Sequence, residues 1–186
     1  MKILAIADRP PSTNLKTLLD QNNPEIIVTL GDLDQSDING LEMVNNIPKL
    51  GVYGNHDSGM YMKELGIIDM HLKTYKYKGI IFGGFQGCVR YKENPTAIMY
   101  TQEEAKKMLE NFPKVDVMLA HCPPYGINDD ISEIAHTGFI ALKEYLEKQS
   151  PKYLFHGHTY PSPADLKTEY LDTKIVYVFG EKIITI

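Results

Sequence analysis

Short apolar segments recur along this chain, and each of them ends at a loop that carries Asp, Asn or His. A brief apolar run bounded by turn residues is typical of a buried strand. Because the polar residues come directly after these runs, the carboxyl ends of the predicted strands carry the groups that can do chemistry. The predicted strands are Lys2–Ala7, Glu25–Leu30, Lys49–Tyr53, Val115–Ala120 and Tyr153–Phe155.

Segments with helical periodicity separate these strands. Thr13–Asn22 places its leucines on one face, and Thr101 and Glu104 have the spacing of a capping box at the start of a helix. Strands that alternate with helices predict an α/β fold with a parallel sheet and right-handed crossovers. The predicted helices are Thr13–Asn22, Ile38–Asn46, Thr101–Asn111 and Phe139–Gln149.

Two strand pairs interrupt this alternation and predict hairpins. Leu72–Tyr77 and Ile80–Phe85 flank the turn residues Lys78-Gly79, and Lys174–Phe179 and Lys182–Ile186 flank Gly180-Glu181. The sheet is therefore expected to be mixed, with antiparallel edges, which gives the fold an α+β character. The apolar C-terminal pair suggests an edge that pairs with a second copy, but the oligomeric state is left open.

Composition narrows the class of protein. The 186 residues are 43% hydrophobic and 23% charged, with a net charge of −5 and no repeat or linker, so we expect a single domain over residues 1–186. The negative charge argues against a long nucleic acid as partner. Cys88 and Cys122 lack the spacing of a disulfide framework or a four-cysteine zinc site. With no signal peptide and no membrane-spanning segment evident, we expect a cytoplasmic protein that does not associate with membranes.

The polar groups after the strands are predicted to converge. In open α/β sheets, ligands bind beyond the carboxyl ends of the strands. Oxygen and imidazole ligands suit divalent metals such as Mn, Fe or Zn, and such metals assist phosphoryl chemistry. Taken singly, each residue also fits a turn, a helix cap or a backbone-bonded loop position, so it is their convergence that favours a metal site. The residues are Asp8, Asp32, Asn55, His56, His121 and His158.

These residues lie in motifs that resemble the calcineurin-like metallophosphoesterases. The motifs are Asp8, Gly31-Asp32, Gly54-Asn55-His56-Asp57, an isolated His121 and Gly157-His158. The stretch from His121 to Gly126, His-Cys-Pro-Pro-Tyr-Gly, is similar to the small phosphodiesterase-like branch of that family. The resemblance spans the chain from Asp8 to Tyr160 and implies a four-layer αββα sandwich with two mixed β-sheets.

The resemblance also implies roles. Asp32 would bridge two metals, Asp8 would bind the first metal, and the second metal would be held by Asp32 with Asn55, His121 and His158. His56 would act as a general acid or electrostatic stabiliser beside the leaving oxygen. The implied activity is hydrolysis of phosphate mono- or diesters by attack of a metal-activated water, with a small phosphate ester or nucleotide as substrate.

Two family ligands are replaced in this chain. Pro10 and Tyr160 stand where the family has histidines of the first metal site. The resemblance therefore implies one divalent ion (Mn, Fe, Zn, Ni or Mg) and an incomplete position for a second. Compensation by Tyr160, His156 or Arg9 is left open. So is the rival hypothesis of a degenerate, weakly active or inactive member that binds a nucleotide or phosphate.

Overall fold

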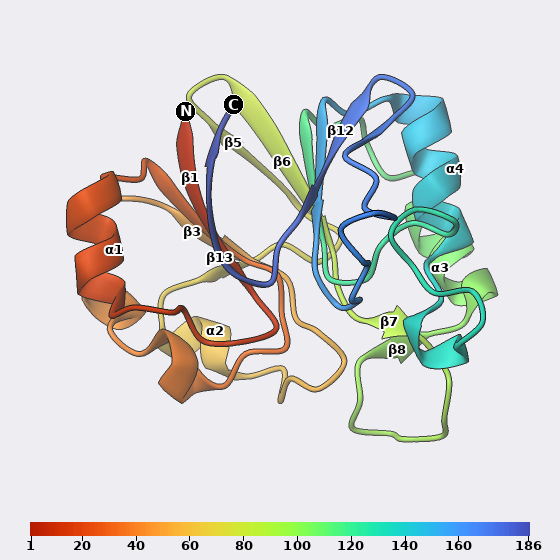
Figure 1. Ribbon diagram of the computed structural model, residues 1–186, viewed down its shortest axis with the longest axis horizontal. Coiled ribbons are helices and arrows are strands. Elements are labelled where there is room, and N and C mark those ends of the chain that lie inside the picture. The colour runs from red at the N-terminus through yellow and green to blue at the C-terminus, as the bar shows by residue number, and fades with distance from the viewer.

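Two large β-sheets pack face to face in the computed structural model, which describes residues 1–186 (Figure 1). The first sheet has the strand order β13-β1-β2-β3-β4. Strands β1 to β4 run parallel, and β13 pairs with β1 in the antiparallel direction. Their bounds are β1 (Lys2–Ala7), β2 (Ile26–Thr29), β3 (Lys49–Gly51), β4 (Ile68–Asp69) and β13 (Gly180–Thr185).

The second sheet has the strand order β11-β12-β10-β9-β6-β5. Its four central strands run parallel and its two edge strands are antiparallel, so this sheet is mixed as well. The strands are β5 (Thr74–Tyr77), β6 (Ile80–Phe85), β9 (Val117–Ala120), β10 (Tyr153–His156), β11 (Glu169–Tyr170) and β12 (Thr173–Tyr177). A separate short pair joins β7 (Cys88–Val89) to β8 (Met99–Tyr100).

Three apolar clusters define four layers. The middle cluster lies between the sheets and joins residues such as Val28 and Leu50 of the first sheet to Phe82 and Leu119 of the second. The outer clusters bury the opposite face of each sheet under its helices. Since alternate residues of a strand face opposite sides, apolar runs are what such doubly covered strands require. The expected αββα sandwich is confirmed.

The helices lie on the two outer faces (Figure 1). Helix α1 (Leu15–Asn22) and the short α2 (Tyr61–Glu64) cover the first sheet, and α3 (Gln102–Leu109) and α4 (Ile140–Gln149) cover the second. The predicted capping box of α3 is present, since Thr101 Oγ1 accepts the Glu104 N–H and Glu104 Oε2 accepts the Thr101 N–H. None of the helices combines the length and the apolar character needed to cross a membrane.

The helix predicted over Ile38–Asn46 is wrong. Two separate 3₁₀ turns, η1 (Gln35–Ile38) and η2 (Leu41–Met43), occupy this region. Gly40 between them has a φ of 100°, a left-handed conformation that interrupts a helix. The buried Lys49 ammonium donates to the carbonyl oxygen of Leu41 at 2.5 Å, and this bond from β3 takes the place of a further helical hydrogen bond.

The hairpin predicted at the C-terminus is also wrong, whereas the hairpin around Lys78-Gly79 is confirmed as β5–β6. The two C-terminal strands belong to different sheets: β12 pairs with β10 and β11, and β13 pairs with β1. The chain crosses between the sheets at Val178, which is buried in the middle cluster. Strand β13 forms an edge of the first sheet.

A third 3₁₀ turn, η3 (Ile134–His136), lies in the long connection between β9 and α4. The fold of this connection matters for the site because η3 reaches the loop that follows β10, where His158 lies.

Candidate metal centre

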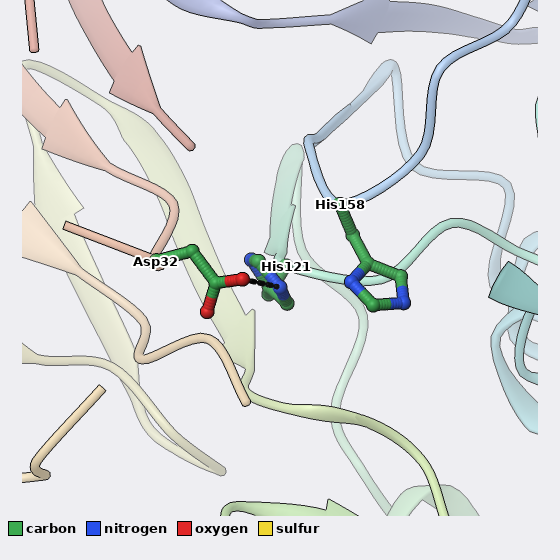
Figure 2. A group of neighbouring side chains, drawn as sticks. All are labelled: Asp32, His121 and His158. Atoms are coloured by element: carbon green, nitrogen blue, oxygen red, sulfur yellow. Dashed lines mark ion pairs between the residues drawn. The ribbon is translucent and has the colours of Figure 1, made fainter. Parts of the chain in front are cut away.

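The predicted site residues come from both sheets. Asp8 and Asp32 follow β1 and β2 of the first sheet, while His121 and His158 follow β9 and β10 of the second. The carboxyl ends of both sheets therefore contribute to one site. Asp32, His121 and His158 each offer one potential ligand atom, and these three atoms lie within 4.8 Å of one another (Figure 2). Asn55, after β3, joins them, with its Oδ1 3.2 Å from His121 Nε2.

Asp32 is held with its carboxylate toward the second sheet. Its Oδ1 accepts the backbone N–H of His56 at 2.9 Å, and its Oδ2 lies 3.5 Å from His121 Nε2. Burial alone would raise the pKa of Asp32, but the facing His121 and the hydrogen bonds lower it below its usual value. Asp32 is therefore an anion, as a metal ligand must be.

His121 is fully buried, and its two ring nitrogens have different partners. Nδ1 donates to the carbonyl oxygen of Leu30 at 2.8 Å, and Nε2 faces Asn55 and Asp32. Burial acts to lower the pKa of His121, but the Asp32 and Asp8 charges outweigh it and raise the pKa to about 9. Nε2 thus points at the other ligand atoms and carries a proton that a cation must displace.

The two ring nitrogens of His158 also have different roles. Nε2 donates to the carbonyl oxygen of Ala135 in η3 at 2.9 Å, which leaves the lone pair on Nδ1. In Figure 2 one ring nitrogen of His158 points toward His121 and the other points away. Burial, together with the neighbouring His121, lowers the pKa of His158 to about 3, so this imidazole is neutral.

This donor set fits a divalent cation. Metal-bound histidines characteristically donate their other N–H to a backbone carbonyl or carboxylate, which fixes the tautomer and the ring orientation. Both histidines have that second bond here. A carboxylate, an amide oxygen and two imidazoles together suit Mn, Fe, Zn or Ni.

The Asp8 carboxylate binds the backbone of the loop that follows β10. Both of its carboxylate oxygens accept the N–H of His158 at 3.0 Å, and it lies outside the group of three ligands described above. Burial raises the pKa of Asp8 to about 6, although His121 and the hydrogen bond from His158 oppose this. A Cβ at Gly157 would lie 2.3 Å from Asp8 Oδ2, so glycine is required where the loop after β10 passes this carboxylate.

The two positions at which the resemblance predicts replaced ligands lie on the surface. Pro10 is exposed, and Tyr160 is 65% exposed, with its ring in edge contact with those of His136 and Phe179. Burial and the nearby carboxylates raise the pKa of Tyr160, which disfavours a phenolate ligand. The guanidinium of Arg9 lies over the Phe179 ring, 4.1 Å from its centre.

His156 has a structural environment. It is completely buried, its Nε2 accepts a hydrogen bond from Asn128 Nδ2 at 3.0 Å, and its Nδ1 donates to the Gly157 carbonyl. Burial lowers the pKa of His156 to about 4. Since both ring nitrogens are occupied, His156 is not placed to replace a missing ligand.

The role of Asp57 was missed by the sequence reasoning. Its carboxylate accepts the backbone N–H groups of Asp32, Leu33 and Gly54 and the hydroxyl of Tyr61. Asp57 therefore ties the loop after β3 to the loop after β2. A signal was present, because an Asp three residues after a glycine in a turn commonly bonds nearby backbone N–H groups.

The family model for calcineurin-like phosphoesterases matches residues 1–162. This chain belongs to the calcineurin-like phosphoesterases. The matched segment contains every residue of the candidate metal centre, and membership in this family supports a metal-dependent phosphoesterase in general. Comparison with curated proteins finds no match for this phosphoesterase.

Solved structures agree with this family at the level of the fold. A crystal structure of a Thermus thermophilus protein has a TM-score of 0.65 at 17% identity, covering 96% of this phosphoesterase and 89% of that chain. A hypothetical protein from the same organism has a TM-score of 0.55 at 17% identity, covering 97% of this chain and 76% of its own. At such low identity these structures show a shared architecture.

Proposed function

We propose that this phosphoesterase hydrolyses phosphate mono- or diesters at one divalent cation held by Asp32, Asn55, His121 and His158. The observation that carries the proposal is that potential ligand atoms of Asp32, His121 and His158 lie within 4.8 Å of one another. In each imidazole, the ring nitrogen that faces away from the other ligands donates its N–H to a backbone carbonyl. Such a cation, when bound, neutralises phosphate oxygens and lowers the pKa of water to make it a usable nucleophile.

The protein's own residues have separate tasks in this proposal. Asp32 and Asn55 supply oxygens, and the two imidazoles supply nitrogens. His56 is exposed beside Asn55 at the wall of a cavity, where its ring can donate a proton to the leaving alcohol oxygen. Its position is fixed through the bond from its backbone N–H to Asp32.

Phosphodiesters are the preferred substrates in this proposal. The carboxylates of Asp8, Asp32 and Asp57 all lie at the site, and a diester brings one negative charge where a monoester brings up to two. With a single divalent cation, the lower charge of a diester is easier to accommodate. A small phosphate ester or nucleotide fits this description.

The test is hydrolysis of bis(p-nitrophenyl) phosphate by protein supplied with Mn²⁺. We expect turnover that a chelator abolishes, and a loss of at least about 100-fold in kcat for Asp32→Asn and for His121→Ala. Asp20→Asn is the matched control, because Asp20 lies exposed on α1 and pairs only with Lys16. Equal activity of all these variants would refute the proposed site.

A second candidate is binding of a nucleotide or phosphate without turnover. It is favoured by the surface positions of Pro10 and Tyr160, which leave no histidine at either place. The double variant Pro10→His, Tyr160→His separates the two candidates. An impaired hydrolase should gain both a second bound metal and rate, whereas a binding protein should retain phosphate affinity without gaining turnover.

A further inference from the structure

A cavity of about 660 Å³ opens beside the candidate proton donor His56. Asn55 and His56 form one of its walls, so it adjoins the candidate metal centre. Its lining also includes Asp34, Glu64 in α2 and Asn94. Its volume lies within the range of about 300–1,000 Å³ that is common for small-molecule sites.

Apart from the candidate proton donor His56, the side chains lining this cavity that can carry a charge near neutral pH are all carboxylic acids. Asp34 and Glu64 are exposed to it, and no Lys or Arg is among its lining residues. Glu64 is oriented by Gln35, whose Nε2 donates to Glu64 Oε2 at 3.1 Å. The third carboxylate, Asp57, is buried and bonded to backbone N–H groups, so it takes no part in recognition.

The lining also offers neutral groups. Ser58, Asn94 and Thr96 contribute hydroxyl and amide groups, and Met60, which is 73% exposed, contributes an apolar surface. A ligand with hydrogen-bond donors meets the carboxylates of Asp34 and Glu64 in this cavity, while an anionic ligand meets no Lys or Arg.

We propose that this cavity receives the leaving alcohol of the ester and selects alcohols without negative charge, with ammonium or hydroxyl groups facing Glu64 and Asp34. The inference rests on the proposed function, because it takes His56 as the group beside the leaving oxygen. It adds a substrate class: esters of amino alcohols or polyols are accepted, and esters whose leaving group carries a carboxylate or a further phosphate are rejected.

A second cavity has a volume of about 720 Å³. It is lined by His136 and Tyr160 and contains none of Asn55, His56 and Asp32. A leaving alcohol in that cavity would lie away from His56. The first cavity is therefore the one assigned to the leaving group.

The test compares two methyl phenyl phosphate diesters whose leaving phenols carry substituents of opposite charge. They are methyl 4-(aminomethyl)phenyl phosphate and methyl 4-carboxyphenyl phosphate, each assayed with the Mn²⁺-loaded protein by phenol release. We expect the cationic substrate to have the higher kcat/KM by about tenfold or more. Glu64→Gln and Asp34→Asn should each reduce this preference, and Glu64→Lys should reverse it.

The decisive quantity is the change in the kcat/KM preference from one protein variant to another. The intrinsic reactivity of the two phenols is the same for every variant, so it cancels in this comparison. Glu110→Lys is the matched control: Glu110 is exposed at the C-terminal end of α3 on the opposite outer layer and should leave the preference unchanged. An identical preference in the wild type, Glu64→Lys and Glu110→Lys would overturn the inference.

Binding to the metal-free protein separates this inference from the proposed function. Saturation-transfer NMR should detect 4-(aminomethyl)phenol in preference to 4-hydroxybenzoate, and Glu64→Lys should remove that preference. If binding discriminates but no diester is turned over, the hydrolase proposal and the leaving-group assignment fail, and only the charge selectivity of the cavity stands. If diesters are hydrolysed and neither assay discriminates, the cavity assignment fails and the hydrolase proposal stands.

Discussion

His121 Nε2 lies 3.5 Å from Asp32 Oδ2, and this contact joins the two sheets at the centre of the site. His121 follows β9 in the second sheet, and Asp32 follows β2 in the first. In the metal-free protein the carboxylate favours a proton on the imidazole and raises the pKa of His121 to about 9. A cation bound at the proposed centre would take the place of that proton, which would link the chemistry of the site and the stability of the fold through the same pair.

The first prediction concerns the pH dependence of stability. The pKa of His121 is about 9 in the folded protein and near 6.5 when unfolded. The protonated His121 therefore stabilises the folded protein fully below pH 6.5, and this stabilisation is lost as pH rises toward 9. His156 and His158, whose folded pKa values lie below 6.5, are neutral in the folded protein throughout this window, and the protons that they still bind when unfolded near pH 6.5 offset only a small part of the loss. Chelator-treated protein should lose about 2 kcal/mol of unfolding free energy between pH 6.5 and 9, measured by urea titration.

The variant His121→Gln is the control for this prediction. Glutamine does not titrate, so its unfolding free energy should change little over the same range. A wild-type stability that stays constant or rises between pH 6.5 and 9 would contradict the assignment of the proton to His121.

The second prediction concerns metal affinity. A cation that binds His121 Nε2 must displace the proton there, so affinity for Mn²⁺ should rise by about tenfold per pH unit between pH 7 and 8. Calorimetry in two buffers of different ionisation enthalpy should show about one proton released per ion. An affinity that does not depend on pH would show that His121 is not a ligand.

The third prediction concerns Asp57. The variant Asp57→Asn replaces an acceptor by an amide whose N–H₂ must face one of three backbone N–H groups. We expect a loss of about 2 to 3 kcal/mol in unfolding free energy, together with weaker Mn²⁺ binding because Asp32 loses its support. Native stability and metal affinity in this variant would show that the bonds to Asp57 do not position Asp32.

The fourth prediction concerns Gly54. A Cβ at this position would lie 2.1 Å from Asp32 Oδ1 and 2.5 Å from Asp32 N, so Gly54→Ala must displace Asp32. We expect Mn²⁺ affinity to fall by about tenfold or more. Gly79→Ala is the control, since a Cβ there meets nothing within 4 Å and only its φ of 82° is unfavourable. Equal Mn²⁺ affinities of the Gly54→Ala and Gly79→Ala variants would contradict the conclusion that a side chain at position 54 displaces Asp32.

Much of the site was predictable because the pattern was local. Asp32, Asn55, His121 and His158 each follow a buried strand, and the carboxyl ends of parallel strands meet in space. Long-range contacts were harder to predict. The C-terminal strands look like a hairpin in sequence, but β12 pairs with β10 and β13 pairs with β1, and Val178 between them is buried in the middle cluster.

The predicted helix over Ile38–Asn46 failed for a related reason. Its periodicity was compatible with a helix, but the left-handed Gly40 and the bond from Lys49 to Leu41 favour 3₁₀ turns. The bond from the Gly54 N–H to Asp57 is local, whereas the bonds from the N–H groups of Asp32 and Leu33 depend on how two loops approach each other, which no local pattern encodes.

The most direct measurement is a calorimetric titration of chelator-treated protein with Mn²⁺, repeated for His121→Ala, Asp32→Asn and the control Asp20→Asn. The proposed centre predicts saturable binding of a cation by the wild type and by Asp20→Asn, and a loss of about 100-fold or more in affinity for the other two. Absence of binding in the wild type, or equal affinity in all four proteins, would contradict it.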